Sequence, residues 1–184
     1  MMRLFIGIPL DDAVLTELSA IAARFGSTGE GLRWPAPETW HITLQFLGNT
    51  GQEQYACIVA RLREIRSAAI PVELEGTGFF EHAGIFFAGV RPTPELMSLQ
   101  QHVTRATGRC GFVTEDRPYR PHITLARAKG AAGARDLRHL KKGMEQPPKF
   151  TAFVAEEFLL YESFTLPAGS QYEIRERFSL HSEA

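Results

Sequence analysis

The sequence has 184 residues, of which 44% are hydrophobic and 22% are charged, and its formal net charge is −1 at pH 7. This composition is typical of a soluble globular protein with a buried core. It argues against an extended, sequence-independent nucleic-acid binder, which would carry a strongly basic surface, although a local basic cleft is still allowed.

Hydrophobic periodicity predicts a chain of mixed strands and helices. Alternating apolar residues are typical of strands, whereas apolar residues at three- and four-residue steps are typical of helices. In chain order, we expect a strand over residues 3–9, a helix over 13–25, a loop over 27–37, a strand over 40–48 closed by a turn at 48–51, a helix over 52–69, strands over 72–80 and 85–90, a helix over 93–107, a strand over 119–128, a helix around 135–143, and strands over 150–164 and 172–180.

Cysteine usage and apolar runs indicate the cellular setting. Cys57 and Cys110 belong to no Cys-x-x-Cys pair, so neither a disulfide framework nor a zinc ribbon is expected, and a reducing cytoplasm is the simplest location. The N-terminal apolar stretch is too short for a secretory signal, and no run approaches the roughly 18 apolar residues of a membrane span. We therefore expect a soluble, unprocessed protein.

One tetrapeptide, His-Ile-Thr-Leu, occurs twice, at residues 41–44 and 122–125. Successive side chains of a strand point to opposite faces, so the histidine and the threonine of each copy share one face. The isoleucine and the leucine share the other face and are expected to enter the core. Each copy thus predicts an imidazole beside a hydroxyl on one side of a strand.

The order of motif strand, helix, strand and strand follows both copies, which indicates one internal duplication covering most of the chain. We expect a single α+β domain over residues 1–184, made of two pseudo-symmetric lobes. Each lobe would contribute an antiparallel sheet with helices on its outer face. The two sheets would then enclose a central cleft that carries both motifs.

Two histidines and two threonines around one cleft suit phosphodiester chemistry. A 2′,3′-cyclic phosphate needs a base on the incoming oxygen and an acid on the departing oxygen, and histidine fills both roles near neutral pH. Threonine hydroxyls can donate hydrogen bonds to the phosphoryl oxygens as charge grows on them. The repeat therefore predicts an acid, a base and two phosphate donors.

The remaining histidines are interpreted as structural or solvated. These are His82, His102, His139 and His181. A catalytic zinc usually has three protein ligands, and neither motif has a carboxylate or a third histidine at ligand spacing beside it, so we expect no metal and no cofactor. The charged run at residues 173–177 is typical of the solvent side of an edge strand.

Several segments together resemble the 2H phosphoesterase superfamily, and specifically the RNA 2′,3′-cyclic phosphodiesterases historically called 2′-5′ RNA ligases. The resemblance spans nearly the whole chain, and two HxTx motifs in the right order are far more specific than one. The residues that carry it are RLFIGI at 3–8, Arg33 and Trp34, HITLQFLG at 41–48, YRPHITLAR at 119–127, LYES at 160–163, and Gly169, Tyr172, Phe178 and Leu180.

The resemblance implies a metal-independent enzyme that opens a 2′,3′-cyclic phosphate to a 2′-phosphomonoester. It implies that His41 protonates the departing 3′ oxygen and that His122 accepts the proton of the attacking water. Thr43 and Thr124 match phosphate-binding threonines. Arg127 matches an arginine near the phosphate, but its odd spacing from Thr124 requires a bend or a loop position there.

Three aromatic residues are candidates for base or ribose contacts: Phe46, Tyr119 and Trp34. Aromatic rings stack on the bases of single-stranded RNA, yet each of these residues could equally pack in the core or anchor a loop.

The expected partners are RNA ends or oligonucleotides with a 2′,3′-cyclic phosphate, with no membrane partner, and the expected oligomeric state is a monomer. The reverse reaction would join such an end to a 5′ hydroxyl in a 2′-5′ linkage. The same four residues would also suit another small 2′-5′ or cyclic-phosphate nucleotide. A module that binds RNA ends without turnover is a third hypothesis, which intact His-Thr pairs in both copies disfavour.

Overall fold

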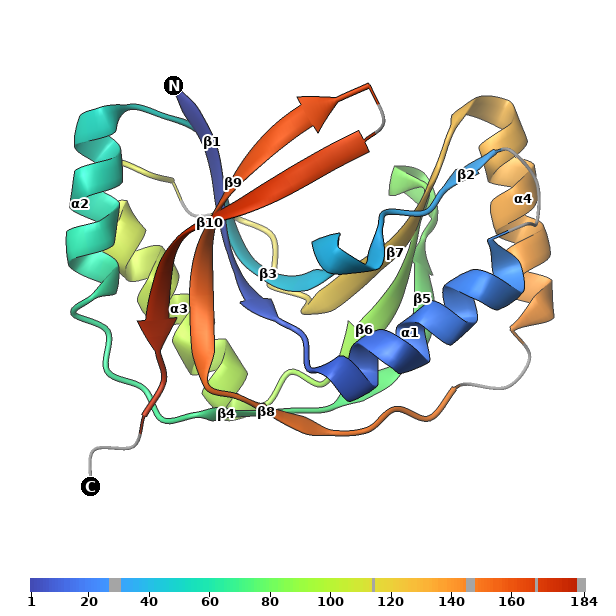
Figure 1. The fold of residues 1–184 in the computed structure, drawn as a ribbon, viewed down its shortest axis with the longest axis horizontal. Helices are drawn as coiled ribbons and strands as arrows, with labels where there is room; N and C mark the ends of the chain where they lie inside the picture. Colours follow the sequence, from blue (N-terminus) through green and yellow to red (C-terminus); the bar gives the residue numbers. More distant parts are fainter. Residues whose placement is uncertain (27–30, 114, 145–147, 168, 182–184) are drawn as a thin grey trace.

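The protein is described by a computed structural model that covers residues 1–26, 31–113, 115–144, 148–167 and 169–181. It is an α+β fold with two four-stranded antiparallel sheets (Figure 1), so the expected fold class is confirmed. The first four residues of the loop expected at 27–37 lie outside the described residues. Among the described residues, no helix is long and apolar enough to cross a membrane.

The first sheet has the strand order β10-β9-β1-β3 and the second has the order β2-β7-β6-β5. A separate two-stranded ladder joins β4 and β8. The strands are β1 (Met2–Pro9), β2 (Leu32–Arg33), β3 (His41–Thr50), β4 (Ile70–Val72), β5 (Leu74–Phe80), β6 (Ile85–Val90), β7 (His122–Ala128), β8 (Phe153–Ala155), β9 (Glu157–Leu166) and β10 (Gly169–Ser179).

In the described part of the chain, four α-helices flank the sheets, and two short 3₁₀ helices lie in the connections. α2 and α3 lie on the side of the first sheet, and α1 and α4 lie on the side of the second (Figure 1). Their bounds are α1 (Asp12–Phe25), η1 (Pro37–Thr39), α2 (Gln52–Leu62), η2 (Glu81–Ala83), α3 (Pro94–Gly108) and α4 (Gly130–Gly143).

The chain crosses between the sheets after each motif strand. β5 and β6 follow the first motif in sequence, but β6 pairs with β7 of the second motif. β9 and β10 follow the second motif, but β9 pairs with β1 beside the first. These pairings are non-local, so local periodicity predicts the hairpins but not the sheets that receive them.

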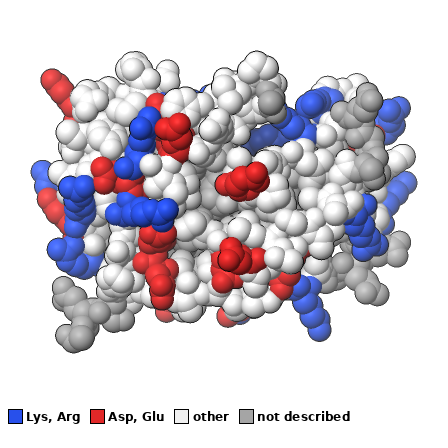
Figure 2. All heavy atoms as spheres, viewed as in Figure 1, with Lys and Arg blue, Asp and Glu red and all other residues white. Residues whose placement is uncertain are grey.

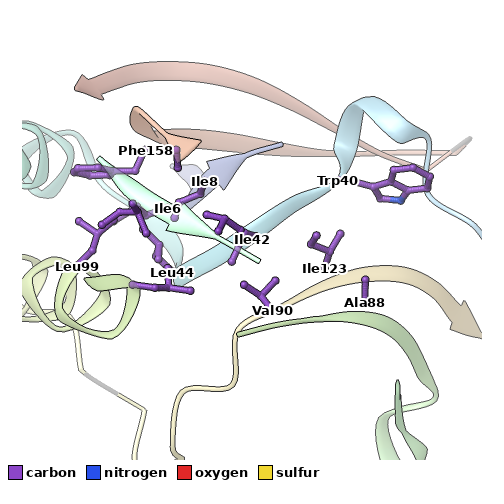
Figure 3. Packing of buried hydrophobic residues seen from close by; sticks show 14 of the residues in the cluster. Ile6, Ile8, Trp40, Ile42, Leu44, Ala88, Val90, Leu99, Ile123 and Phe158 are labelled. Carbon is purple, nitrogen blue, oxygen red and sulfur yellow. The ribbon is translucent and has the colours of Figure 1, made fainter. Parts of the chain in front are cut away.

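The two motifs show the expected alternation of faces. Ile42, Leu44, Ile123 and Leu125 are buried in one core cluster, whereas the histidines and threonines are half-buried. Figure 3 shows Ile42, Leu44 and Ile123 within this cluster, together with Leu99 of α3. Burial of these four aliphatic residues fixes which way each motif histidine points.

Several element boundaries differ from the expectations; among them, the strand expected over 119–128 begins at His122, and the strand expected over 150–164 is divided into β8 and β9. The expected helix over residues 52–69 ends at Leu62, because the chain tightens into short turns and must extend to pair β4 with β8. β3 does not turn at 48–51: Gly48 adopts φ 69°, and the strand continues to Thr50 against β1. β2 forms inside the loop expected at 27–37, and η1 begins at the last residue of that loop. α4 begins at Gly130, five residues early, because its glycines and alanines obscure the apolar periodicity.

The expectation that the cysteines form no disulfide is wrong in this structure. Cys57 of α2 and Cys110, two residues beyond α3, are bonded, with their Cα atoms 5.9 Å apart. They are 53 residues apart in sequence and belong to no short motif, so only the packing of α2 against α3 brings them together.

Candidate active site

The two motif strands meet where the sheets approach each other. β3 is the edge strand of the first sheet, and β7 is covered on its outer side only by the two residues of β2. β3 and β7 contact each other directly. The Tyr119 hydroxyl donates a hydrogen bond to the Thr43 carbonyl at 2.8 Å, which ties the segment before β7 to the first motif.

His41 is held at both ring nitrogens. Its Nδ1 lies 2.7 Å from the Thr39 carbonyl oxygen, so Nδ1–H is the donor there. Its Nε2 lies 2.9 Å from the Thr43 hydroxyl. In the neutral ring, Nε2 accepts from that hydroxyl. When Nε2 is protonated it donates to Thr43 instead, which frees the hydroxyl hydrogen for another acceptor.

Aromatic rings from three other strands enclose His41. The ring centroid of Phe5 lies 4.6 Å from that of His41, Tyr172 stands edge-on at 5.5 Å, and Tyr161 lies at 5.8 Å. The pKa of His41 is lowered from 6.5 to about 4, mainly because the ring is buried. The Thr39 hydrogen bond opposes this shift, and the charges of His122 and Arg127 contribute to it. His41 is therefore neutral near pH 7 when no anion is bound.

His122 repeats the backbone anchor in a more open setting. Its Nδ1 donates to the Arg120 carbonyl at 2.7 Å, two residues upstream as in the first motif. Phe80 and Phe87 stand edge-on to its ring at 4.9 and 5.5 Å. Burial lowers the pKa of His122, the Arg120 hydrogen bond opposes this shift, and the charges of Arg127 and Arg120 add to it.

A β-bulge brings Arg127 to the histidine face. Thr124 pairs with Phe87 and Ala126 with Phe86, so Leu125 is an extra residue in β7. Leu125 and Ala126 are consecutive buried residues, and the alternation resumes with Arg127 exposed. The bend that the odd spacing of Arg127 required is therefore present. Arg127 also lowers the pKa of both histidines, which places its charge near both.

The first motif contains the same bulge. Gly7 pairs with Thr43 and Ile6 with Gln45, so Leu44 is the extra residue. Phe46 then occupies the place in β3 that Arg127 occupies in β7. Its side chain is 64% exposed, and its ring centroid is 6.1 Å from Phe5 beside His41. The two halves of the site thus differ at this position by an aromatic ring and a guanidinium.

Arg33 contributes to the family resemblance, which suggested a place for it at the rim of the cleft but not among the phosphate-binding residues. It pairs directly with Arg127 across β2 and β7, so the two side chains share one face of the sheet. Like charges directly opposite each other are destabilising, and an anion between them would relieve the repulsion. A Cβ on Gly169 would lie 2.8 Å from Arg33 Nη2, so the tip of the β9–β10 hairpin reaches this arginine.

The other two aromatic candidates lie differently. Tyr119 is half-buried against the core and its hydroxyl is already bonded to Thr43. Trp34 is also half-buried, edge-on to Phe86 at 5.9 Å. Both rings pack against the hydrophobic core, whereas Phe46 is the aromatic candidate that faces solvent.

Sequence reasoning also missed the aromatic rings around His41. Phe5, Tyr161 and Tyr172 come from strands whose pairing is non-local. A signal was present in β1, where Phe5 interrupts the expected alternation and makes both faces of the strand apolar. Within the ranges that the structure describes, no group of three or more His, Cys, Asp or Glu side chains could hold a metal ion.

A family model described as the 2′-5′ RNA ligase superfamily matches residues 10–160. The sequence is 32% identical to an RNA 2′,3′-cyclic phosphodiesterase of Archaeoglobus fulgidus over 131 residues, covering 70% of this chain and 73% of the relative. It is 30% identical to an RNA 2′,3′-cyclic phosphodiesterase of Thermus thermophilus over 200 residues, covering 99% of this chain and 92% of the relative.

Solved structures show the same architecture. The structure of E. coli LigT complexed with 3′-AMP is similar with a TM-score of 0.83 and 26% identity, covering 98% of this chain and 99% of LigT. The structure of a Thermus thermophilus protein is similar with a TM-score of 0.82 and 26% identity, and the similarity covers the whole of both chains.

Proposed function

The chain belongs to the 2′-5′ RNA ligase superfamily, and we propose that it is an RNA 2′,3′-cyclic phosphodiesterase that works by acid-base catalysis between His41 and His122. The observation that carries the proposal is the matched anchoring of the two imidazoles. Each Nδ1–H is bonded to a backbone carbonyl at 2.7 Å, so each Nε2 is the nitrogen left for proton transfer. Two such groups beside Arg127 suit one phosphate.

The reaction requires one bond to form and one to break at phosphorus. A water oxygen attacks phosphorus, and its proton passes to Nε2 of His122. The bond between phosphorus and the 3′ oxygen breaks, and that oxygen takes the proton from Nε2 of His41. The product is a 2′-phosphomonoester with a free 3′ hydroxyl, and the two histidines exchange protonation states.

Phosphate binding falls to hydroxyls and guanidinium groups. Thr43 and Thr124 donate to the non-bridging oxygens, and Arg127 with Arg33 supplies the positive charge. Thr43 can do this once His41 is protonated, because its hydroxyl hydrogen is then released from Nε2. Phe46 is placed to stack on the base or ribose that precedes the phosphate.

His41, the proposed acid, becomes protonated when the substrate binds. In the unliganded protein the pKa of His41 is about 4, so the ring is neutral near pH 7. A cyclic phosphate carries one negative charge, and an opposite charge within hydrogen-bonding distance raises the pKa of an imidazole. Binding of the anion therefore favours protonation of the histidine that must act as the acid.

The reverse reaction would use the same groups. A 5′ hydroxyl would replace water, and a 2′-5′ phosphodiester would form from the cyclic end. We treat ligation as secondary because water is present at far higher concentration than any 5′ hydroxyl.

The test is incubation of the purified protein with a short RNA ending in a 2′,3′-cyclic phosphate, in the presence of a chelator. We expect conversion to a 2′-phosphate, and loss of that conversion in His41→Ala and in His122→Ala. Binding of the RNA without turnover would support a binding module instead. Turnover that survives either substitution would overturn the acid-base pair, and turnover abolished by the chelator would indicate a metal.

A further inference from the structure

A cavity of about 280 Å³ opens between the end of α2 and the second half of α3. We call it the arginine cavity because its walls carry Arg61, Arg66, Arg105 and Arg109, with His102 beside them. Ile65 and Ala106 complete its lining. It lies apart from the histidines: α3 packs on the face of β3 that carries Leu44, and His41 is on the opposite face.

The charge of the arginine cavity is strongly positive in a chain whose net charge is −1. Four guanidinium groups face one carboxylate, Glu64, which is bonded to Arg61 at 3.0 Å. Helix C-termini attract cations, but each of the two ends here contributes only roughly half a negative charge. About two positive charges remain in excess. Figure 2 shows Lys and Arg side chains, with Asp and Glu side chains among them, at the edge of the molecule where α2 lies.

The wall formed by α3 carries a row of basic side chains. His102, Arg105 and Arg109 follow one another at three- and four-residue steps, which places them on one face of the helix. Within the described part of the chain, neither Arg105 nor Arg109 forms an ion pair with a carboxylate. Like charges four residues apart destabilise a helix slightly, and a bound anion would remove that cost.

The opposite wall is fixed in place. Arg66 donates to the carbonyl oxygens of Arg63 and Ile65, at 2.8 and 3.4 Å, which holds the turn after α2. Cys57 lies one helical turn before Arg61, and Cys110 follows Arg109 directly. The disulfide between them therefore links the two walls and limits how far they can separate.

We propose that the arginine cavity binds phosphate groups of an RNA strand, beyond the end that occupies the histidine site. This inference rests on the proposed function for the identity of the strand. Guanidinium groups bind phosphate oxygens in pairs, and a row of them along a helix suits successive phosphates rather than one isolated ion. Because the sheet separates the two sites, only an RNA long enough to pass around its edge reaches both.

The test compares a labelled RNA 12-mer and a dinucleotide, both ending in a 2′-phosphate so that no turnover occurs. Affinity is measured by fluorescence anisotropy, directly or in competition, as a function of salt. The variants are Arg105→Ala with Arg109→Ala on one wall, and Arg61→Ala with Arg66→Ala on the other. The matched control is Arg138→Ala with Lys142→Ala, which removes two exposed charges from α4.

For single-stranded nucleic acid, each neutralised phosphate contributes about 0.7 to the slope of log affinity against log salt. Loss of two contacts should lower that slope by about 1.4. With equal affinities at a 1 M salt reference, the variant should then bind the 12-mer about 25-fold more weakly than the wild type at 0.1 M salt. The cavity variants should bind the dinucleotide with wild-type affinity. The α4 control should bind the 12-mer with wild-type affinity.

Unchanged 12-mer affinity in both cavity variants would overturn the proposal. It would also fail if the α4 control lost as much affinity, or if the cavity variants lost mononucleotide binding but kept RNA binding. Turnover of a dinucleotide cyclic phosphate, measured in the same preparations, reports on the proposed function separately. The two results are independent, because 12-mer affinity can be compared between variants even in a protein that shows no turnover.

Discussion

The two halves of the histidine site share a backbone anchor and a β-bulge, and they differ in the side chains that surround each imidazole. His41 and His122 each donate Nδ1–H to the carbonyl two residues upstream, at 2.7 Å in both cases. Around His41 stand Phe5, Tyr161 and Tyr172, and its pKa falls to about 4. His122 is more open and lies near Arg127, and its pKa is lowered too.

This comparison shows that the local backbone anchor sets the tautomer of each imidazole, whereas the surrounding side chains set its pKa. The anchor is local, because it joins residues two apart in one strand. The pKa of His41 depends on rings from β1, β9 and β10 and on charges from β7, whereas the pKa of His122 depends on burial and on the charges of Arg127 and Arg120 in its own segment. A duplicated motif can thus supply two chemically identical groups, and unequal surroundings can make one an acid and the other a base.

The largest effect should come from removing either imidazole. We expect His41→Ala and His122→Ala each to lower kcat/KM by about 10²–10⁴. Because the two act as a unit, the double variant should be little worse than the weaker single variant. Single-turnover rates with a cyclic-phosphate dinucleotide measure this. Losses that multiply in the double variant would contradict a shared proton-transfer step.

Substitutions at the equivalent positions Arg127 and Phe46 should change different kinetic parameters. Arg127→Ala removes a charged phosphate contact worth roughly 1.5–3 kcal/mol, so we expect kcat/KM to fall about 10- to 150-fold. Phe46→Ala should raise KM about fivefold, at the low end of base-stacking energies, with kcat unchanged. Steady-state kinetics separate the two. A change in kcat from Phe46→Ala would place that ring in the chemical step instead.

Removing an aromatic ring beside His41 should narrow the difference in pKa between the two histidines. Tyr172→Ala lets water reach His41, so its pKa should rise from about 4 toward 6.5, because burial is the main cause of the shift. Phe87→Ala is the matched variant and should raise the pKa of His122 alone. NMR titration of the ring protons measures both. An unmoved His41 resonance in Tyr172→Ala would assign the shift to neighbouring charges.

The smallest effect should come from Tyr119→Phe. The variant removes the hydroxyl that donates to the Thr43 carbonyl at 2.8 Å and should lower the free energy of unfolding by about 1 kcal/mol. Denaturant unfolding measures the loss. A much larger fall in activity than in stability would mean that Tyr119 contacts the substrate.

The sequence predicted the local features well, because periodicity fixes them. Both motif strands, the hairpins and the inward direction of Ile42 and Ile123 followed from alternation alone. It did not predict the exchange of hairpins between sheets, the disulfide or the aromatic rings around His41, since each depends on segments distant in sequence. The bulge at Leu125 lies between these cases: the spacing of Arg127 required a bend, and the pairing of β7 with β6 provides it.

The pH dependence of kcat/KM tests the central claim most directly, because it reports the free protein's acid and base. One histidine must be neutral and the other protonated. The profile should therefore be level between about pH 4 and the lowered pKa of His122, below 6.5. Above that pKa it should fall about tenfold per pH unit, because the histidine pair then loses the one proton that the reaction requires. A rate that stays constant from pH 5 to pH 9 would contradict the pairing of His41 and His122.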